Sequence, residues 1–208
     1  MKLPAAVSHL GVTLLLIASV VAVSLIAFSS ERVKRALILS PYQVRRGEVY
    51  RLFTGGWIHA DMMHLAMNMF VLYMFANRVV AKFGPILFAG LYVSAVVVAH
   101  VPTTLRYWNR PGYGSLGASG AVAAVMFSAI LLYPQMRIGL LFLPFAVPGF
   151  VFGALYMVYS VWQSYSASDN VNHDAHFTGA LYGALVTWAI APTQVEHTIG
   201  VIRHMLGI

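Results

Sequence analysis

The chain has 208 residues, of which 60% are hydrophobic and only 9% are charged, and its mean hydropathy is +0.76. Because about a quarter of the residues in a soluble globular domain are charged, this composition excludes a soluble domain and indicates a protein that crosses a membrane several times. The net charge of +7 does not indicate nucleic-acid binding, since the basic residues stand between apolar runs and beside aromatic residues, as is typical of a membrane surface.

Six apolar runs follow one another along the chain. Each approaches the roughly 17 to 25 residues that a helix needs to cross the hydrocarbon core of a bilayer. We therefore predict an all-α membrane protein with six transmembrane helices, organised as a single domain over residues 1–208. The first run has 19 residues and is longer than the apolar segment of a signal peptide, which is the alternative for this run. The predicted helices cover residues 10–28, 62–77, 85–101, 118–133, 147–162 and 175–191.

The segment between the first two runs combines basic residues with Tyr42, Tyr50 and Trp57. We expect it to lie in the membrane interface and to contact anionic lipid headgroups. The distribution of basic residues favours a topology with the N-terminus outside, although a loop that lies in the interface contributes little to this rule. The basic residues of the segment are Arg32, Lys34, Arg35, Arg45, Arg46 and Arg51.

Polar residues stand at the N-terminal ends of the second, fourth and sixth predicted helices. In a chain that crosses the membrane back and forth, these three helices run in the same direction, so their N-terminal ends lie on one side. We therefore expect three groups of polar side chains to converge there. They are His59, His64 and Asn68 at the second helix, Ser119 at the fourth and His176 at the sixth.

The fourth predicted helix has only 16 residues, or about 24 Å, against a hydrocarbon core of about 30 Å. A glycine-rich stretch leads into it, and non-helical backbone below the membrane surface needs a protein interior or a water-filled cavity around it. Ser119 is therefore expected to lie below the membrane surface, inside the protein, and in contact with water. At the first turn of a helix it lies among unpaired backbone N–H groups, which stabilise an oxyanion. The alternative role for Ser119 is a helix N-cap.

His176 is followed by Gly179 and Gly183 on the same helical face, and these small residues let a neighbouring helix approach closely. Gly120 lies on a similarly thin face of the fourth helix. Packing of the two faces would bring the imidazole to the Ser119 hydroxyl. The alternative for His176 is an interfacial histidine without a catalytic role.

His64 and Asn68 lie one helical turn apart and share a helical face. Their side chains would supplement backbone N–H groups as donors to an oxyanion. Taken alone, such residues are more often hydrogen-bonding groups between membrane helices.

Together these motifs resemble the rhomboid family of intramembrane serine proteases, and the resemblance covers residues 49–191. It implies a rhomboid-like six-helix bundle with an interfacial first loop and a short, buried fourth helix. It also implies that Ser119 is the nucleophile and His176 the general base of a dyad that needs no carboxylate. Asp174 lies two residues from His176 on a different side of the helix, so we do not expect it to be a third member. The motifs are Gly117-Ala118-Ser119-Gly120, then Ala175-His176 with Gly179 and Gly183, and His59, His64 and Asn68 upstream.

The same resemblance implies an oxyanion hole formed by His64, Asn68 and the Ser119 N–H. The implied substrates are other membrane proteins, cleaved in or near their transmembrane helices without a metal or other cofactor. We expect the protein in a bacterial inner membrane. The chain departs from the family pattern at Tyr50, where Trp is usual before Arg, and at Ala123, where many members have an aromatic residue four positions after the serine.

Three other interpretations stay open. A catalytically inactive rhomboid-like protein would bind membrane helices without cutting them. A transporter would place ionisable groups nearer the membrane midplane. The spacing His173-Asp174-Ala175-His176 is a further candidate for a metal site, but the sequence offers no third convergent ligand and no His-Glu-x-x-His motif. The absence of cysteine excludes thiolate chemistry.

Overall fold

The computed structural model describes residues 9–139, 145–166 and 171–208. The chain is mostly helical, with one small pair of strands. The elements are α1 His9–Ser29, α2 Glu31–Leu37, α3 Pro41–Arg45, α4 Arg51–Thr54, a 3-10 helix Gly55–Trp57, α5 Met62–Arg106, α6 Ser119–Leu132, β1 Arg137–Gly139, β2 Ala146–Pro148, α7 Gly149–Ser166, α8 His173–Ile190 and α9 Pro192–Leu206.

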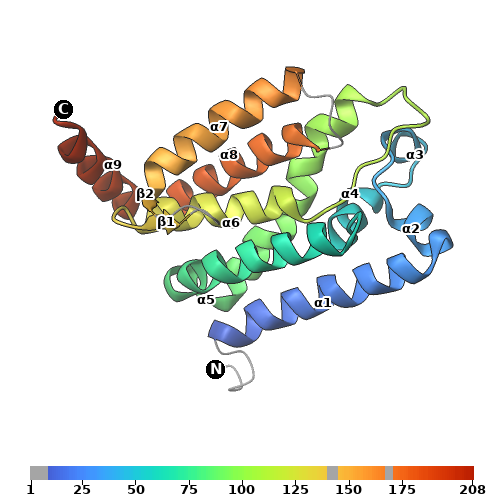
Figure 1. The fold of residues 1–208 in the computed structure, drawn as a ribbon, viewed down its shortest axis with the longest axis horizontal. Coiled ribbons are helices and arrows are strands. Elements are labelled where there is room, and N and C mark those ends of the chain that lie inside the picture. Colours follow the sequence, from blue (N-terminus) through green and yellow to red (C-terminus); the bar gives the residue numbers. More distant parts are fainter. Residues whose placement is uncertain (1–8, 140–144, 167–170) are drawn as a thin grey trace.

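The central element of the bundle is α6, which lies between α5 and α8 (Figure 1). All but two of its residues, Ser119 and Leu131, are buried, because the apolar residues of this helix lie on all of its faces. On the outside, α1 packs along α5 and α7 packs along α8 (Figure 1). The N-terminal ends of α6 and α8 lie at the same end of the bundle as α2, α3 and α4 (Figure 1).

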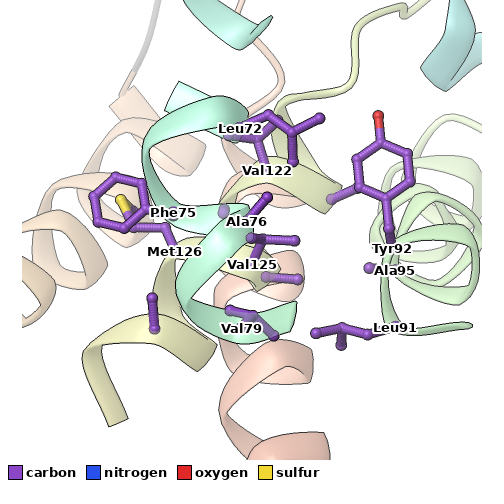
Figure 2. Packing of buried hydrophobic residues seen from close by; sticks show 14 of the residues in the cluster. Leu72, Phe75, Ala76, Val79, Leu91, Tyr92, Ala95, Val122, Val125 and Met126 are labelled. Carbon is purple, nitrogen blue, oxygen red and sulfur yellow. The ribbon is translucent and has the colours of Figure 1, made fainter. Parts of the chain in front are cut away.

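The long helix α5 is broken at Gly84, whose φ of 76° and ψ of 168° are not helical. Glycine tolerates this positive φ, and Pro85 starts the next helical segment with a preset φ. The two segments extend beyond the predicted helices 62–77 and 85–101. Both contribute to one hydrophobic cluster with α6; Figure 2 shows Leu72 and Val79 of the first segment, Leu91 of the second and Val125 of α6 among its members.

Two features differ from the sequence-based expectation. Residues 192–206 form α9, which lies beyond the last predicted helix at 175–191. Pro192 at its start and Gly207, with a φ of 73°, at its end are typical helix boundaries. Strands β1 and β2 form a small antiparallel pair in which Ile138 lies opposite Val147. It stands between α6 and α7, where the sequence predicts only a connection.

Among the described residues, two helices are long and apolar enough to cross a membrane by themselves, Leu10–Ser29 and Met62–Arg106. Ser119–Leu132 is a shorter apolar helix. The six-span arrangement stays a prediction.

Candidate active site

Ser119 and His176 lie in direct contact. His176 Nε2 is 2.7 Å from Ser119 Oγ, and both residues are half-buried. Ser119 is the first residue of α6, while Ala118 occupies the N-cap position, so the serine is not the N-cap of its helix. The helix that carries His176 begins at His173, before the predicted start at residue 175. A hydroxyl and an imidazole at this distance form the pair that a serine nucleophile needs.

The close approach of α6 and α8 depends on glycine. A Cβ on Gly179 would lie 2.0 Å from the carbonyl oxygen of Gly120, and a Cβ on Gly183 would lie 2.1 Å from that of Ala124. A Cβ on Gly120 would lie 2.5 Å from Ala99 Cβ and 3.0 Å from the Ala175 carbonyl oxygen. No side chain fits at these contacts, so small residues are required for the two helices to bring the hydroxyl and the imidazole together.

The loop before Ser119 is held by hydrogen bonds from its backbone. Gly117 N–H donates to the Gly55 carbonyl (2.9 Å), and Ala118 N–H donates to His59 Nε2 (3.3 Å). Gly117 has a φ of 120°, and a Cβ there would lie 2.7 Å from the His64 ring. Only glycine tolerates both the backbone conformation and the close ring. The loop therefore presents Ser119 from a fixed backbone.

His59 is fully buried and links this loop to α1. Its Nδ1 is 3.0 Å from Ser24 Oγ, and the Ser24 hydroxyl donates to the Trp57 carbonyl (3.0 Å). Because Nε2 accepts from Ala118, the ring is the neutral tautomer that donates from Nδ1 to Ser24. His59 thus lies against the loop and belongs to a continuous chain of hydrogen bonds from Ala118 through Ser24 to Trp57.

Of the two expected oxyanion donors on α5, His64 lies against this loop and Asn68 lies one helical turn after it. The His64 ring contacts Gly117, and its centroid is 4.9 Å from that of His59. Asn68 is 7% exposed, and its amide donates one hydrogen to the His64 carbonyl (2.9 Å). An asparagine amide carries a second N–H, so this bond does not exhaust its donors.

Asp174 does not face His176 as a third member of a triad would. Its carboxylate is bonded to Arg106 Nη1 (2.9 Å) and to the Ser164 hydroxyl. These contacts join the end of α5, α7 and the first turn of α8. Among the described residues, no group of three or more His, Cys, Asp or Glu side chains is arranged to hold a metal ion.

Sequence reasoning missed two groups near the pair. Tyr156 of α7 stacks on the His176 ring, with centroids 6.1 Å apart and an interplanar angle of 24°. This places an aromatic ring beside the histidine although position 123 is alanine. Asn172 caps α8, and the signal for it is a capping residue just before the helix. No sequence pattern identifies the partner of a tyrosine on a separate helix.

The first loop is anchored by Arg51, although Tyr50 stands before it where Trp is usual in the family. Arg51 is 7% exposed and donates to the carbonyls of Arg35 and Ile38, both at 2.8 Å. Its guanidinium also pairs with Glu48, to which the Tyr50 hydroxyl donates as well. These bonds to Arg51 and Tyr50 hold the pKa of the Glu48 carboxyl below its usual value.

A cavity of about 520 Å³ opens beside His64, at the end of the bundle where α6 and α8 begin. Its walls are largely polar. They include His64, Arg106, Tyr113, Ser115, Asn172 and Asp174.

Comparison with protein families defines the class of this protein. Residues 46–193 match the family model described as the Rhomboid domain, close to the span of 49–191 expected from the sequence motifs. The chain belongs to the rhomboid family. The family predicted from the serine and histidine motifs is therefore confirmed.

Named relatives support the same assignment. The chain is 27% identical over 178 residues to RHOMBOID-like protein 12, mitochondrial, of Arabidopsis thaliana, a match that covers 78% of this chain and 52% of that protein. It is 31% identical over 131 residues to the human presenilin-associated rhomboid-like protein, mitochondrial, covering 60% and 34%. Rhomboid-like protein 16, chloroplastic, of Arabidopsis thaliana is 29% identical over 115 residues, covering 48% and 36%. The chain thus spans between a third and a little over half the length of these relatives.

The expected location in a bacterial inner membrane is wrong. The relatives are named as mitochondrial or chloroplastic proteins and point to an organellar membrane. Apolar runs and basic loops identify a bilayer as the solvent. They do not identify which bilayer, because hydrocarbon thickness differs by only a few ångströms between membranes.

Proposed function

We propose that the protein is an intramembrane serine endopeptidase that hydrolyses peptide bonds in or near the transmembrane helices of other membrane proteins. The observation that carries this proposal is the 2.7 Å contact between Ser119 Oγ and His176 Nε2 at the start of a buried helix. Membership of the rhomboid family supports it. The organellar relatives favour an organellar membrane as the place of action.

In the proposed first step, His176 Nε2 takes the proton of the Ser119 hydroxyl as Oγ attacks the substrate carbonyl. The carbonyl oxygen becomes an oxyanion. The Ser119 N–H, which has no partner within α6 at the first helical position, donates to it together with His64 and Asn68. Such donors matter most where charge develops in the transition state.

Collapse of the tetrahedral intermediate breaks the peptide bond, and His176 returns its proton to the leaving amine. The acyl-enzyme that remains is an ester of Ser119. Water then attacks the ester carbonyl as His176 takes one of the water protons. The second collapse releases the carboxyl product and restores the serine hydroxyl. We expect water to arrive from the polar cavity that His64 lines, because the His64 ring also lies against Gly117, two residues before Ser119.

We further propose that α1, the two segments of α5, α6, α7 and α8 cross the membrane. Large apolar side chains point outward from the helices around α6, including Leu15 of α1, Ile86 of α5 and Val158 of α7, which are 64%, 68% and 68% exposed. In a bilayer these side chains would face lipid. With 14 residues, α6 is about 21 Å long, so Ser119 would lie below the membrane surface. The basic first loop would contact anionic headgroups.

The proposal is tested with a fluorophosphonate probe, which forms a covalent bond with an activated serine. We expect labelling of the detergent-solubilised protein, no labelling of Ser119→Ala, and little of His176→Ala. Ser29→Ala, at the end of α1, is the matched control and should label like the wild type. Cleavage of a transmembrane test substrate should follow the same order. If the wild type and Ser119→Ala labelled equally, the inactive rhomboid-like alternative would replace the protease.

A further inference from the structure

Asn172 makes three side-chain hydrogen bonds to three separate parts of the protein. Its Oδ1 accepts from Ala175 N–H (3.0 Å) at the first turn of α8 and from the Thr103 hydroxyl (2.7 Å) near the end of α5. Its Nδ2 donates to Ser115 Oγ (2.9 Å) in the loop before α6. One short side chain therefore ties together the three elements that surround the start of the Ser119 helix.

The assignment of oxygen and nitrogen in this amide follows from its partners. A backbone N–H can only donate, so the atom facing Ala175 must be the oxygen. The atom facing Ser115 is then the nitrogen, and a serine hydroxyl accepts from it. An amide is the uncharged side-chain group that accepts twice and donates once in this arrangement.

The place of these bonds along the chain matters for the active pair. Asn172 lies four residues before His176, and Ser115 lies four residues before Ser119. Ser115 is itself held by paired backbone bonds with Leu39 (2.9 and 3.0 Å), and Thr103 is fully buried. The Asn172–Ser115 bond therefore joins the segment before His176 to the segment before Ser119. Each of its two residues is also held by further hydrogen bonds, Ser115 to Leu39 and Asn172 to Thr103.

We propose that Asn172 is a positioning residue that sets the register between the Ser119 loop and α8. This inference rests on the proposed function, because it concerns the geometry of the Ser119–His176 pair. The glycine contacts hold α6 and α8 side by side from Gly120 and Ala175 onward. Asn172 joins the residues just before these contacts, and a shift of about 1 Å between the reacting atoms costs on the order of 10²-fold in rate.

The test separates the N-cap role of Asn172 from its bridging role. Asn172→Ser keeps a good N-cap but is too short to reach Thr103 and Ser115. Ser115→Ala removes only the acceptor in the loop. Ser30→Ala, which removes the cap of α2, is the control for cap loss away from the site. The readouts are the rate of fluorophosphonate labelling, kcat and KM for a transmembrane substrate, and the melting temperature in detergent.

We expect Asn172→Ser to lower kcat and the labelling rate by about 10-fold to 10²-fold with little change in KM, and Ser30→Ala to label like the wild type. The double variant Asn172→Ser/Ser115→Ala should be little worse than Asn172→Ser alone, because both changes remove the same bond. Wild-type labelling and turnover in Asn172→Ser, or additive losses in the double variant, would overturn the inference.

Failure of the proposed function would look different. In that case the wild type would label no more than Ser119→Ala and would not cleave the substrate. The melting temperatures of four proteins then test the Asn172–Ser115 bond without any measurement of activity. These proteins are the wild type, the two single variants and the double variant. Coupled losses of stability would uphold the Asn172–Ser115 link, and independent losses would reject it.

Discussion

Replacing Gly183 with alanine tests whether the close contact of α6 and α8 controls the active pair. The new Cβ would lie 2.1 Å from the Ala124 carbonyl oxygen and 2.6 Å from the Ala124 carbonyl carbon and Cα. The nearest of these distances is more than about 1 Å short of a normal van der Waals contact. The neighbouring atoms are backbone, so the helices themselves must move apart. The Ser128 hydroxyl donates to the carbonyls of both Ala124 and Gly183, and separation of the helices would lengthen its bond to Gly183.

The magnitudes favour a larger effect on activity than on stability. Overpacking costs about 1 to 3 kcal/mol, while alanine gains about 0.5 to 1 kcal/mol over glycine within a helix. A net loss of roughly 0 to 2.5 kcal/mol leaves most of the protein folded. A displacement of about 1 Å at the hydroxyl and imidazole lowers the rate by on the order of 10²-fold.

The assay compares the labelling rate and the melting temperature of Gly183→Ala with those of Gly90→Ala. Gly90 lies within a helix, and no neighbouring atom lies within 4 Å of the position that a Cβ would take there, so alanine should be neutral or slightly stabilising. Gly200→Ala, in the open part of α9, is a second control. If Gly183→Ala labelled as fast as the wild type, the reasoning from helix contact to active geometry would be refuted.

Three further outcomes are expected. Asn68→Ala should lower kcat by up to about 10² to 10³-fold with little change in KM, and a rise in KM alone would assign the residue to substrate binding. Tyr156→Phe should keep the stacked ring and near-normal kcat, whereas Tyr156→Ala should lower kcat; equal activity of the two would remove the role of the ring in holding His176. Arg51→Lys should lower the free energy of unfolding by about 1 to 3 kcal/mol in a denaturation experiment, because an ammonium cannot satisfy two carbonyls and Glu48 in the guanidinium geometry; an unchanged value would show that this anchor is dispensable.

Part of the site can be predicted because it depends on local pattern and helix direction. Ser119 and His176 stand at the beginnings of helices that run the same way, and glycines at spacing four mark a face on which helices approach closely. From these facts alone the hydroxyl and the imidazole are expected to meet. The helix α9 lies outside the predicted set although Pro192 and Gly207 mark its ends.

Other parts have no local signal. The contact of Tyr156 with His176 and the bridge from Asn172 to Ser115 each join residues that are far apart in the sequence. Asn172 is readable as a helix cap, but not as the partner of a loop serine. The sequence pattern does not identify which cellular membrane holds the protein, because apolar helices have the same chemistry in every bilayer.

By itself, the sequence determined that this chain belongs in a membrane, where its long apolar helical segments lie, and which polar residues stand at one end of them. Hydropathy and helical periodicity are properties of neighbouring residues, so the sequence alone carries them. Only the tertiary structure decided that α6 and α8 touch backbone to backbone, that Asn172 joins two distant segments, and that Tyr156 stacks on His176. These contacts depend on which helix faces pack together, and that choice is made by the whole bundle.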